Sequence, residues 1–438
     1  MKQFRAYQRG SWQTRVLYVG ILSALFLALM VFATCGDEDQ ADAPTTVPSV
    51  TDTPAPDPSG TTLRPRGEWT EANPATRAEI EAELGKYKGK SISVLDGGGA
   101  WQAAHRKAYY IPFHEEFGIE IIEDTTSSIV GQIRGMSETG NITVDIGVWG
   151  IDVAIQLGRS GHAAELDYSV IDLRDHFPDL VEAGKPYIAG GGDIFSTVVA
   201  YSTESFPDSG PQPSTMADFF DLEEFPGKRG MWSFWQINPH LAYMAQNPEV
   251  FENPAALASL SSLTDAQMEE AWTFLDDFVS RAGSDFITWD SGSDCPALLI
   301  AGELDLCTTW NGRIYDAVVA DDAPINICWE CGHVMDADYY FVPNGLKELD
   351  AERWELAQLF LAWMSFPDVN ARESLYIPYG PVNQKSLPLL EGSAWDHIRD
   401  ALPTAPDNAQ YGVFLDSSWA GASADAAQER WSSILQTR

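Results

Sequence analysis

The chain has 438 residues, of which 45% are hydrophobic and 21% are charged. This length fits about two or three domains of ~150 residues, and the composition is that of a folded globular protein. Acidic residues outnumber basic ones by 64 to 27, which gives a formal net charge of -37. Because such a surface repels phosphate backbones, the composition argues against nucleic acid as a partner. It attracts cations, although a broad acidic excess is also a common means to solubility.

Residues 1–34 predict an export signal or a membrane anchor, because four basic residues precede an apolar run from Val16 to Ala33. The run ends in the sequence Phe-Ala-Thr-Cys-Gly, which resembles a lipobox, where signal cleavage leaves an acylated cysteine, here Cys35. An uncleaved anchor is the alternative, since about 20 apolar residues can span a bilayer. Both interpretations place the bulk of the chain outside the cytoplasm, in the periplasm or on the outer face of the cell membrane.

Residues 35–75 predict a disordered tether between the membrane and the folded part. The stretch is rich in Thr, Pro, Asp and Ser, and its apolar residues follow no period. A segment of this composition cannot bury enough apolar surface to order itself. It would allow a surface-bound protein to reach both a ligand and a transporter.

Short strands alternate with helices from residue 75 onward, which is typical of parallel α/β sheets. In the first half we expect helices over 75–84, 101–117, 129–136 and 151–161, and strands over 91–95, 119–122 and 144–148. Ligands of such sheets bind beyond the carboxyl ends of the strands. The segments expected near a ligand are therefore 97–101, 149–152, 233–240, 309–313 and 335–340.

The pattern changes near Thr203, as if the chain left one domain, built a second and returned to the first. In this half we expect strands over 230–234, 304–310, 325–329 and 339–342, and helices over 265–281 and 351–365. We predict an α/β protein with two discontinuous lobes and a helical C-terminal tail. Lobe 1 comprises 76–200 and 338–395, and lobe 2 comprises 201–337 and 396–438.

The four cysteines after the leader predict two disulfides, because an even set in an oxidising compartment is usually paired. Three pairings are possible, and the sequence does not choose among them. A zinc site is the alternative, but the spacing suits no compact zinc ribbon. The residues are Cys295, Cys307, Cys328 and Cys331.

Local signatures of enzymes are absent from the sequence. It contains no Gly-x-Ser-x-Gly elbow and no His-Glu-x-x-His helix. We therefore predict a protein that is not an enzyme and has no cofactor and no resident metal. An exported hydrolase stays an alternative, because catalytic triads are assembled in space.

Several segments, taken in order, resemble the spermidine/putrescine-type solute-binding proteins of ABC transporters. The resemblance covers roughly residues 90 to 390. It rests on Gly-Gly-Ala-Trp-Gln-Ala-Ala-His at 98–105, Tyr-Ser-Thr-Glu-Ser-Phe-Pro at 201–207, Asp-Leu-Glu-Glu-Phe-Pro-Gly-Lys-Arg at 221–229, Thr-Trp-Asn-Gly-Arg at 309–313 and Pro-Tyr-Gly-Pro-Val-Asn at 378–383.

The resemblance implies a type II periplasmic-binding-protein fold, in which two lobes joined by hinge strands close on a solute. The hinges are expected near 198–202 and 335–338. The residues that it places in the cleft are Trp101, Gly150, Asp152, Trp310, Asp338 and Tyr379, and we add Asp336 and Trp235 from neighbouring positions. Each has a structural alternative: the tryptophans can belong to the core, Asp152 can cap a helix and Asp338 can belong to a turn.

The expected ligand is a small cationic, polyamine-like solute. Carboxylates replace the water around its ammonium groups, and indole faces pack against its methylene groups. Each cation–π contact between an ammonium group and an indole contributes ~1–2 kcal/mol. The chain departs from the family pattern after the strand at 230–234, where Asn238 and His240 stand in place of two acids. We expect a monomer that delivers its solute to an ABC permease, and a metal-binding receptor of the same fold is the alternative.

Overall fold

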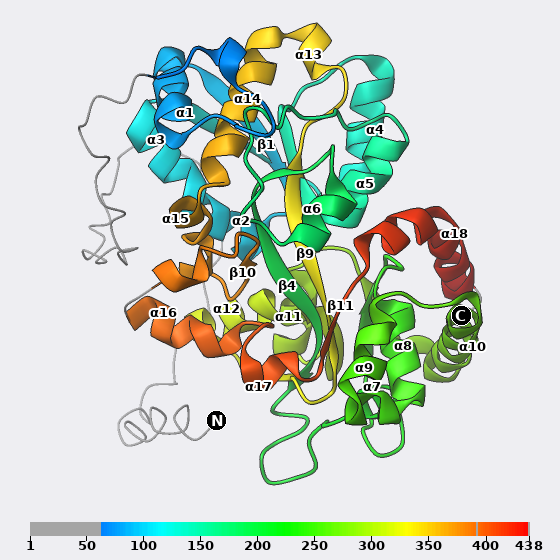
Figure 1. Cartoon of the computed structure of the whole chain (residues 1–438). Coiled ribbons are helices and arrows are strands. Elements are labelled where there is room, and N and C mark those ends of the chain that lie inside the picture. The colour runs from blue at the N-terminus through cyan, green and yellow to red at the C-terminus, as the bar shows by residue number, and fades with distance from the viewer. Residues whose placement is uncertain (1–62, 391–392, 437–438) are drawn as a thin grey trace, which may run out of the picture. The chain divides into compact units, whose positions relative to one another are not determined.

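The computed structural model of the chain describes residues 63–390 and 393–436 (Figure 1). The predicted signal segment, the acylation site at Cys35 and most of the predicted tether lie outside the described residues. The described residues belong to one compact unit. No helix in this part of the chain combines the length and the apolarity needed to cross a membrane.

The tether prediction, residues 35–75, is wrong over its last part. Residues 66–68 form a short 3-10 helix, and the Trp69 side chain is only 6% exposed. Arg64 forms a 2.7 Å ion pair with Glu79, a residue of the first helix. One buried indole and one ion pair therefore anchor the segment to the fold, and neither produces an apolar period in the sequence.

The strands form one mixed sheet in the order β2-β1-β3-β9-β4-β7-β5-β6, with three further short strands paired to β4 or β9. The strands are β1 (Ser91–Asp96), β2 (Glu120–Thr125), β3 (Ile146–Gly150), β4 (Ala189–Ser202), β5 (Arg229–Trp232), β6 (Phe286–Trp289), β7 (Leu306–Trp310), β8 (Ile325–Cys328), β9 (His333–Phe341), β10 (Gly380–Pro381) and β11 (Gly412–Phe414). The predicted strands are present, with ends that coincide with the predicted ones or are shifted by up to six residues.

Helices follow most strands and cover the sheet (Figure 1). They are α1 (Arg77–Leu84), α2 (Gly99–His105), α3 (Ile111–Phe117), α4 (Ile129–Thr139), α5 (Ile151–Arg159), α6 (Pro178–Gly184), α7 (Met216–Phe220), α8 (Asn238–Gln246), α9 (Pro254–Ala258), α10 (Asp265–Ala282), α11 (Asp294–Ile300), α12 (Asn311–Asp321), α13 (Leu346–Leu349), α14 (Ala351–Met364), α15 (Pro367–Asn370), α16 (Ser393–Ile398), α17 (Pro406–Ala409) and α18 (Ser417–Gln436).

Two long strands, β4 and β9, join the two halves of the sheet, and they lie side by side at its centre (Figure 1). β4 pairs with β9 over residues 193–197 and with β7 over residues 197–201. β9 pairs with β3 through residues 338–341. The hinges predicted at 198–202 and 335–338 fall within these two strands.

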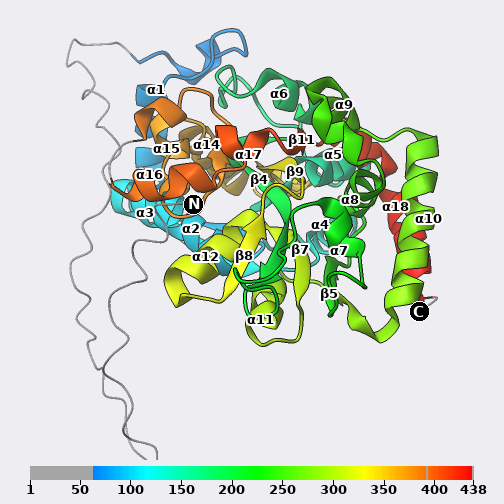
Figure 2. The same ribbon diagram turned by 90° about the horizontal axis from the view of Figure 1, so that it is seen from below.

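The apolar cores follow the two halves. One cluster draws on residues 69–195 and 337–382, and a second on residues 199–334 and 413–434. The C-terminal helix α18 lies beside α10 (Figures 1 and 2), where Trp431 stacks on Trp272 with ring centroids 6.4 Å apart. This distribution agrees with the predicted lobes. Their boundaries stay a prediction.

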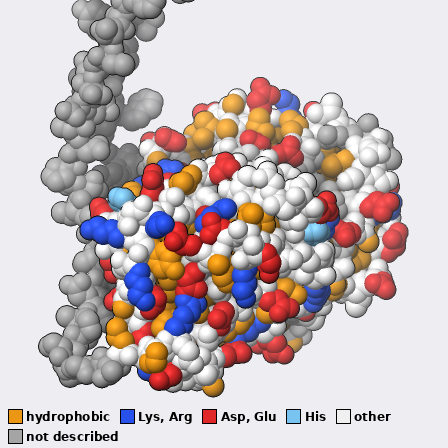
Figure 3. Space-filling view, turned by 90° about the horizontal axis from the view of Figure 1, so that it is seen from above, with side chains coloured by type: hydrophobic (Ala, Val, Ile, Leu, Met, Phe, Trp, Pro, Cys, Tyr) orange, Lys and Arg blue, Asp and Glu red, His pale blue; other side chains and the backbone are white. Residues whose placement is uncertain are grey.

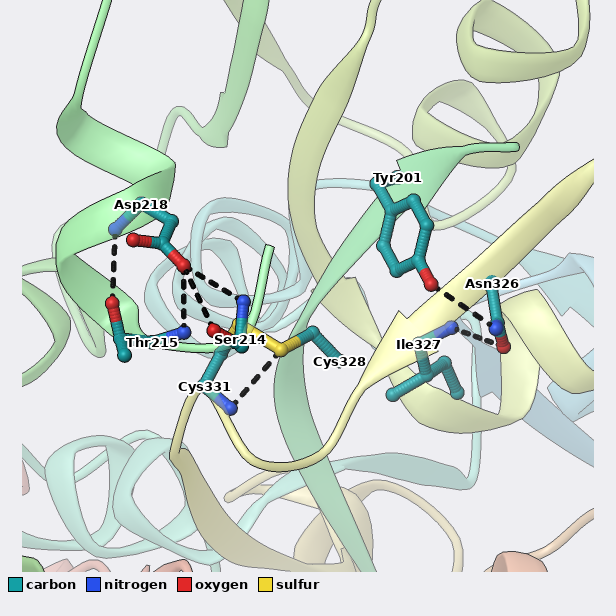
Figure 4. Close-up of a disulfide and its surroundings, with 8 residues drawn as sticks. All are labelled: Tyr201, Ser214, Thr215, Asp218, Asn326, Ile327, Cys328 and Cys331. Atoms are coloured by element: carbon teal, nitrogen blue, oxygen red, sulfur yellow. Dashed lines mark hydrogen bonds between the residues drawn. A yellow bond between two sulfur atoms is a disulfide. The ribbon is translucent and has the colours of Figure 1, made fainter. Parts of the chain in front are cut away.

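The four cysteines form two disulfides, Cys295–Cys307 and Cys328–Cys331, so the zinc alternative for this set is wrong. The first joins α11 to β7. The second closes the turn between β8 and β9, where the Cys331 N–H donates to Cys328 Sγ at 3.1 Å (Figure 4). On β8 itself, the Asn326 amide donates to the hydroxyl of Tyr201 on the neighbouring strand β4 at 3.2 Å (Figure 4). The sequence predicted two disulfides, and both lie in the second half of the fold.

Candidate functional site

A cavity of about 270 Å³ lies where the two halves of the sheet meet. All five segments that the sequence placed near a ligand contribute to its wall. The lining residues are Gly97, Trp101, Thr125, Thr126, Ser127, Trp149, Gly150, Phe195, Thr197, Trp232, Gln236, Ile237, Asp290, Ser291, Gly292, Trp310, Arg313, Asp336, Asp338 and Tyr379.

The floor of the cavity comes from alternate residues of the two central strands. Successive side chains of a strand point to opposite faces, so Asp336 and Asp338 of β9 share one face. Phe195 and Thr197 do the same on β4, and Phe195 lies opposite Asp336 in the β4–β9 register. The pairing of the two central strands therefore presents two acids and one aromatic ring to the same space.

Aromatic rings form the walls on both sides. Trp101 and Trp149 stand at the ends of the first-half strands, with ring centroids 6.4 Å apart in an edge-to-face arrangement. The ring centroid of Trp310, at the end of β7, lies 5.2 Å from that of Trp232. The Cζ atom of Arg313 lies 5.8 Å from the same Trp310 centroid. Such a set offers apolar faces to methylene groups and π faces to a cation.

A glycine in the loop before α11 permits the close approach of the second-half wall. A Cβ at Gly292 would lie 2.7 Å from the Trp310 ring and 2.9 Å from Arg313 Nε. Any side chain at this position would push the indole or the guanidinium out of place.

The two acids on β9 differ in how far their hydrogen bonds are satisfied. Asp336 accepts from the Gln236 amide and from the Ala337 N–H, both at 2.8 Å. In the described part of the chain, no group donates to the Asp338 carboxylate. Burial raises the pKa of both carboxyls well above their ordinary values. Asp338 is therefore the acid that lacks a partner and faces the cavity.

Asp152 lies close to these acids at the start of α5, although it is not part of the cavity wall. It is 1% exposed, and burial raises its pKa to about 6. Its nearness explains the glycine at position 150, because a Cβ there would lie 2.6 Å from Asp152 Oδ1. Asp152 thus contributes negative charge to the site from behind its wall.

Arg313 brings a positive charge to the same cavity from the first turn of α12. It is 5% exposed, and its Nη1 donates to the Gly98 carbonyl at 2.9 Å. Its Nε atom is buried without a hydrogen-bond partner, and no described carboxylate forms an ion pair with it. A buried guanidinium with spare donors is suited to an anionic group of a ligand.

Six of the eight residues predicted for the cleft line the cavity, namely Trp101, Gly150, Trp310, Asp336, Asp338 and Tyr379. The placement of Trp235 there is wrong. Its side chain is fully buried and packs against Trp419 with centroids 6.0 Å apart, because β5 ends at Trp232 and the chain then turns into α8. Asn238 is structural as well, since its amide donates to the Trp232 and Phe234 carbonyls.

The sequence interpretation did not include Arg313, Trp149 or Phe195 among the ligand-binding residues. Arg313 stands three residues after Trp310 at a helix N-terminus, and this spacing places both side chains near one another. That signal was sufficient to find it. Phe195 gave no such signal, because its role depends on the register between β4 and β9.

The acids at the cavity differ from the general acidity of the chain. In the face that Figure 3 shows, acidic side chains are spread among basic and apolar ones and do not gather into one patch. Asp152, Asp336 and Asp338, in contrast, are each at most 7% exposed and lie near one another. The surface charge therefore gives little information about the ligand. The buried acids are the better guide to it.

The chain belongs to the bacterial extracellular solute-binding protein family, whose model matches residues 108–400. A two-lobed sheet with an aromatic, charged cavity at the junction is the structure that this class requires. The chain is thus the substrate-binding component of an ABC transporter, and the family acts outside the cytoplasm.

Relatives of known ligand fit this class. The chain is 26% identical to a gamma-aminobutyric acid-binding protein of Pseudomonas aeruginosa, over 77% of this chain and 89% of that protein. It is similar to the PBP AgtB of A. tumefaciens in complex with agropinic acid, with a TM-score of 0.66, 26% identity, and coverage of 80% of this chain and 99% of that one. A GABA receptor structure matches with a TM-score of 0.62, 26% identity, and coverage of 78% and 97%.

These relatives are solute-binding proteins rather than enzymes, which favours this interpretation over the hydrolase alternative. A spermidine/putrescine transporter protein from Streptococcus pneumoniae also matches, with a TM-score of 0.54, but at 15% identity and coverage of 80% and 98%. That likeness bears on the fold alone, so the solute class is not limited to polyamines.

Proposed function

We propose that the solute is a small ω-amino-acid-like molecule that carries an ammonium group and a carboxylate group. The observation that carries the proposal is the presence of Asp338 and Arg313 in one cavity, each without an ionic partner among the described residues. Asp338 and its neighbour Asp336 receive the ammonium, Arg313 receives the carboxylate, and the indoles hold the carbon chain.

Arg313 is the reason to prefer this solute over a linear polyamine. A diamine would bring its second ammonium toward a guanidinium, and two like charges ~4 Å apart repel by ~4 kcal/mol at an effective dielectric constant of ~20. A carboxylate in the same place gains a charge-assisted hydrogen bond of about 1.5–3 kcal/mol. The difference corresponds to several orders of magnitude in affinity.

The relatives support the proposal, since two of them bind GABA and a third was solved with agropinic acid. GABA has an amine at one end of a short chain and an acid at the other. The cavity, at about 270 Å³, suits a solute of this size.

Three ligands with the same four-carbon length test the proposal: γ-aminobutyrate, putrescine and butyrate. We expect γ-aminobutyrate at 100 times its Kd to stabilise the full-length chain by about 2.7 kcal/mol, seen as a thermal shift of about 3 °C. Butyrate, which has no ammonium, leaves the melting temperature unchanged. Stabilisation by putrescine and not by γ-aminobutyrate would show that a polyamine is the solute.

We also propose that Cys35 is acylated and anchors the chain to the membrane, supported by the basic leader and the apolar run before it. Metabolic labelling with a clickable fatty acid tests this. The wild-type chain takes up the label and the Cys35→Ser variant does not. A labelled Cys35→Ser variant would place the lipid elsewhere.

A further inference from the structure

A second group of buried polar side chains lies directly behind Trp101 and outside the cavity wall. His105, Asp193 and Glu373 are each at most 2% exposed. One atom of each, His105 Nε2, Asp193 Oδ1 and Glu373 Oε1, is buried without a hydrogen-bond partner. One potential ligand atom from each residue can be chosen so that all lie within 4.8 Å of one another. Three potential ligand atoms therefore lie close together, and two of them, His105 Nε2 and Glu373 Oε1, are paired with each other at 3.2 Å.

The other polar atom of each residue is held in place by an outer layer. His105 Nδ1 is 2.7 Å from Asp96 Oδ2, and Asp193 Oδ2 accepts from the Trp101 indole at 2.9 Å. Glu373 Oε2 accepts from the Tyr109 hydroxyl at 3.0 Å. Metal-binding residues have this arrangement: a histidine is oriented by a carboxylate at one ring nitrogen and binds the ion through the other.

The three side chains come from separate elements, so the fold sets their positions. His105 ends α2, Asp193 lies within β4 and Glu373 opens the 3-10 helix at 373–375. Two carboxylates and a histidine are thus buried together in the interior of the fold. His105 stands between Asp96 and Glu373, and Asp193 has only the Trp101 N–H as a partner, so the carboxylates exceed the positive charge near them. A buried carboxylate without a compensating positive charge costs several kcal/mol.

We propose that His105, Asp193 and Glu373 bind one divalent ion of the zinc class. Zinc binds both imidazole nitrogen and carboxylate oxygen, and sites with three protein ligands and one open position are known, whereas Ca²⁺ and Mg²⁺ prefer six or more oxygen ligands. Two ligands at ~2.0–2.2 Å from a tetrahedral zinc are ~3.3–3.5 Å apart. His105 Nε2 and Glu373 Oε1 are 3.2 Å apart, and an Asp193 oxygen lies within 4.8 Å of a ligand atom of each of the other two residues.

This site is separate from the solute cavity and was not expected from the sequence, which predicted no resident metal. The ion supplies two positive charges to the pair of carboxylates. Since Trp101 donates to Asp193 and also lines the cavity, a bound ion fixes the indole that the solute contacts. The role is structural, and the proposal does not depend on which solute binds.

Metal content gives the first test. Full-length chain purified without chelator is expected to hold about one zinc ion, measured by inductively coupled plasma mass spectrometry. After chelation, a zinc titration by calorimetry gives one saturable site. Glu373→Gln and Asp193→Asn each weaken it by at least about 100-fold, and Asp336→Asn, which changes a buried acid of the cavity wall, does not.

Cobalt gives a second readout that does not require the variants to be stable. Co²⁺ bound to a nitrogen and two oxygens at low coordination number shows visible absorption bands that hexaaqua-cobalt lacks. Circular dichroism checks that each variant is folded. Absence of metal and of saturable zinc binding in the folded wild-type chain overturns the proposal, and so does unchanged zinc affinity in folded Glu373→Gln and Asp193→Asn.

The same samples separate this proposal from the proposed function. A wild-type chain that binds γ-aminobutyrate but no zinc overturns the metal site alone. A chain that holds zinc but responds to none of the four-carbon ligands overturns the solute class alone.

Discussion

The indole N–H of Trp101 donates to Asp193 Oδ2 at 2.9 Å, while the ring of the same residue forms part of the cavity wall. Asp193 in turn stands opposite Asp338 in the β4–β9 register. One tryptophan thus connects the solute cavity with the buried acids behind it. Residues that look like separate features in the sequence belong to one layered site.

Replacement of Trp101 by Phe tests this connection. The variant keeps an aromatic wall but removes the donor to Asp193, so we expect the free energy of unfolding to fall by about 1–3 kcal/mol and the solute affinity to fall about 10-fold. Denaturant unfolding and calorimetry measure the two effects. Trp149→Phe is the matched control, because Trp149 lines the same cavity without a hydrogen bond to a buried acid. Equal stability losses in the two variants would contradict the role of the N–H.

The two acids of β9 should respond differently to neutralisation. Asp338→Asn is expected to weaken solute binding about 100-fold, because it removes a wall carboxylate to which no described residue donates a hydrogen bond. Asp336→Asn should cost about 10-fold or less, since Gln236 already binds that side chain. Neither variant should lower the melting temperature by more than a few degrees, because burial already disfavours both charges. The ranking is read from calorimetric Kd values, and the reverse order contradicts it.

Arg313 should decide whether the cavity prefers a ligand with a carboxylate or one with a second ammonium group. In Arg313→Gln we expect the affinity for γ-aminobutyrate to fall by about 100-fold and that for putrescine to rise or stay the same, because the positive charge that repels the second ammonium is gone. Arg281→Gln is the control, since it makes the same charge change on the outer face of α10. An equal loss of affinity for both ligands in Arg313→Gln would indicate that Arg313 acts through packing and not through its charge.

The Cys295–Cys307 bridge should support both the stability and the site. It closes a loop of 12 residues and ties α11 to β7, which ends at Trp310, so Cys295→Ser/Cys307→Ser should cost about 3 kcal/mol and also weaken solute binding. Cys328→Ser/Cys331→Ser opens a loop of three residues and should cost about 1.5 kcal/mol with little effect on binding. Denaturant unfolding of both double variants under non-reducing conditions gives the comparison. A larger cost for the shorter loop contradicts it.

Much of the site could be predicted from local patterns. Trp101 follows β1, and Gly150 and Trp310 are the last residues of β3 and β7. Their place at strand ends is visible in the apolar runs and turn residues of the sequence. Asp336 and Asp338 are two apart on one strand, which puts both on one face whatever the register is.

The remainder depends on contacts between distant segments. Trp235 was misplaced because the strand before it ends at Trp232, two residues before its predicted end at 234. The cluster of His105, Asp193 and Glu373 could not be found at all, since the three residues are up to 268 positions apart and only the packing of α2 against β4 and the segment at 373–375 brings them together.

The buried histidines should make the fold sensitive to acid, and His240 isolates one contribution. Its side chain is fully buried beside Trp419, and burial lowers its pKa from 6.5 to about 4. Below pH 6.5 His240 binds a proton in the unfolded chain but not in the folded chain. The contribution of neutral His240 to the free energy of unfolding is therefore complete above pH 6.5 and is lost as the pH falls toward 4. Relative to His240→Gln, the wild-type chain should therefore lose about 2–3 kcal/mol of its free energy of unfolding between pH 7 and pH 4, measured by denaturant unfolding.

His176 and His333 have the same lowered pKa and are common to both proteins, so their effect cancels in the difference. A wild-type-to-variant difference that does not change with pH would show that His240 is protonated in the folded chain.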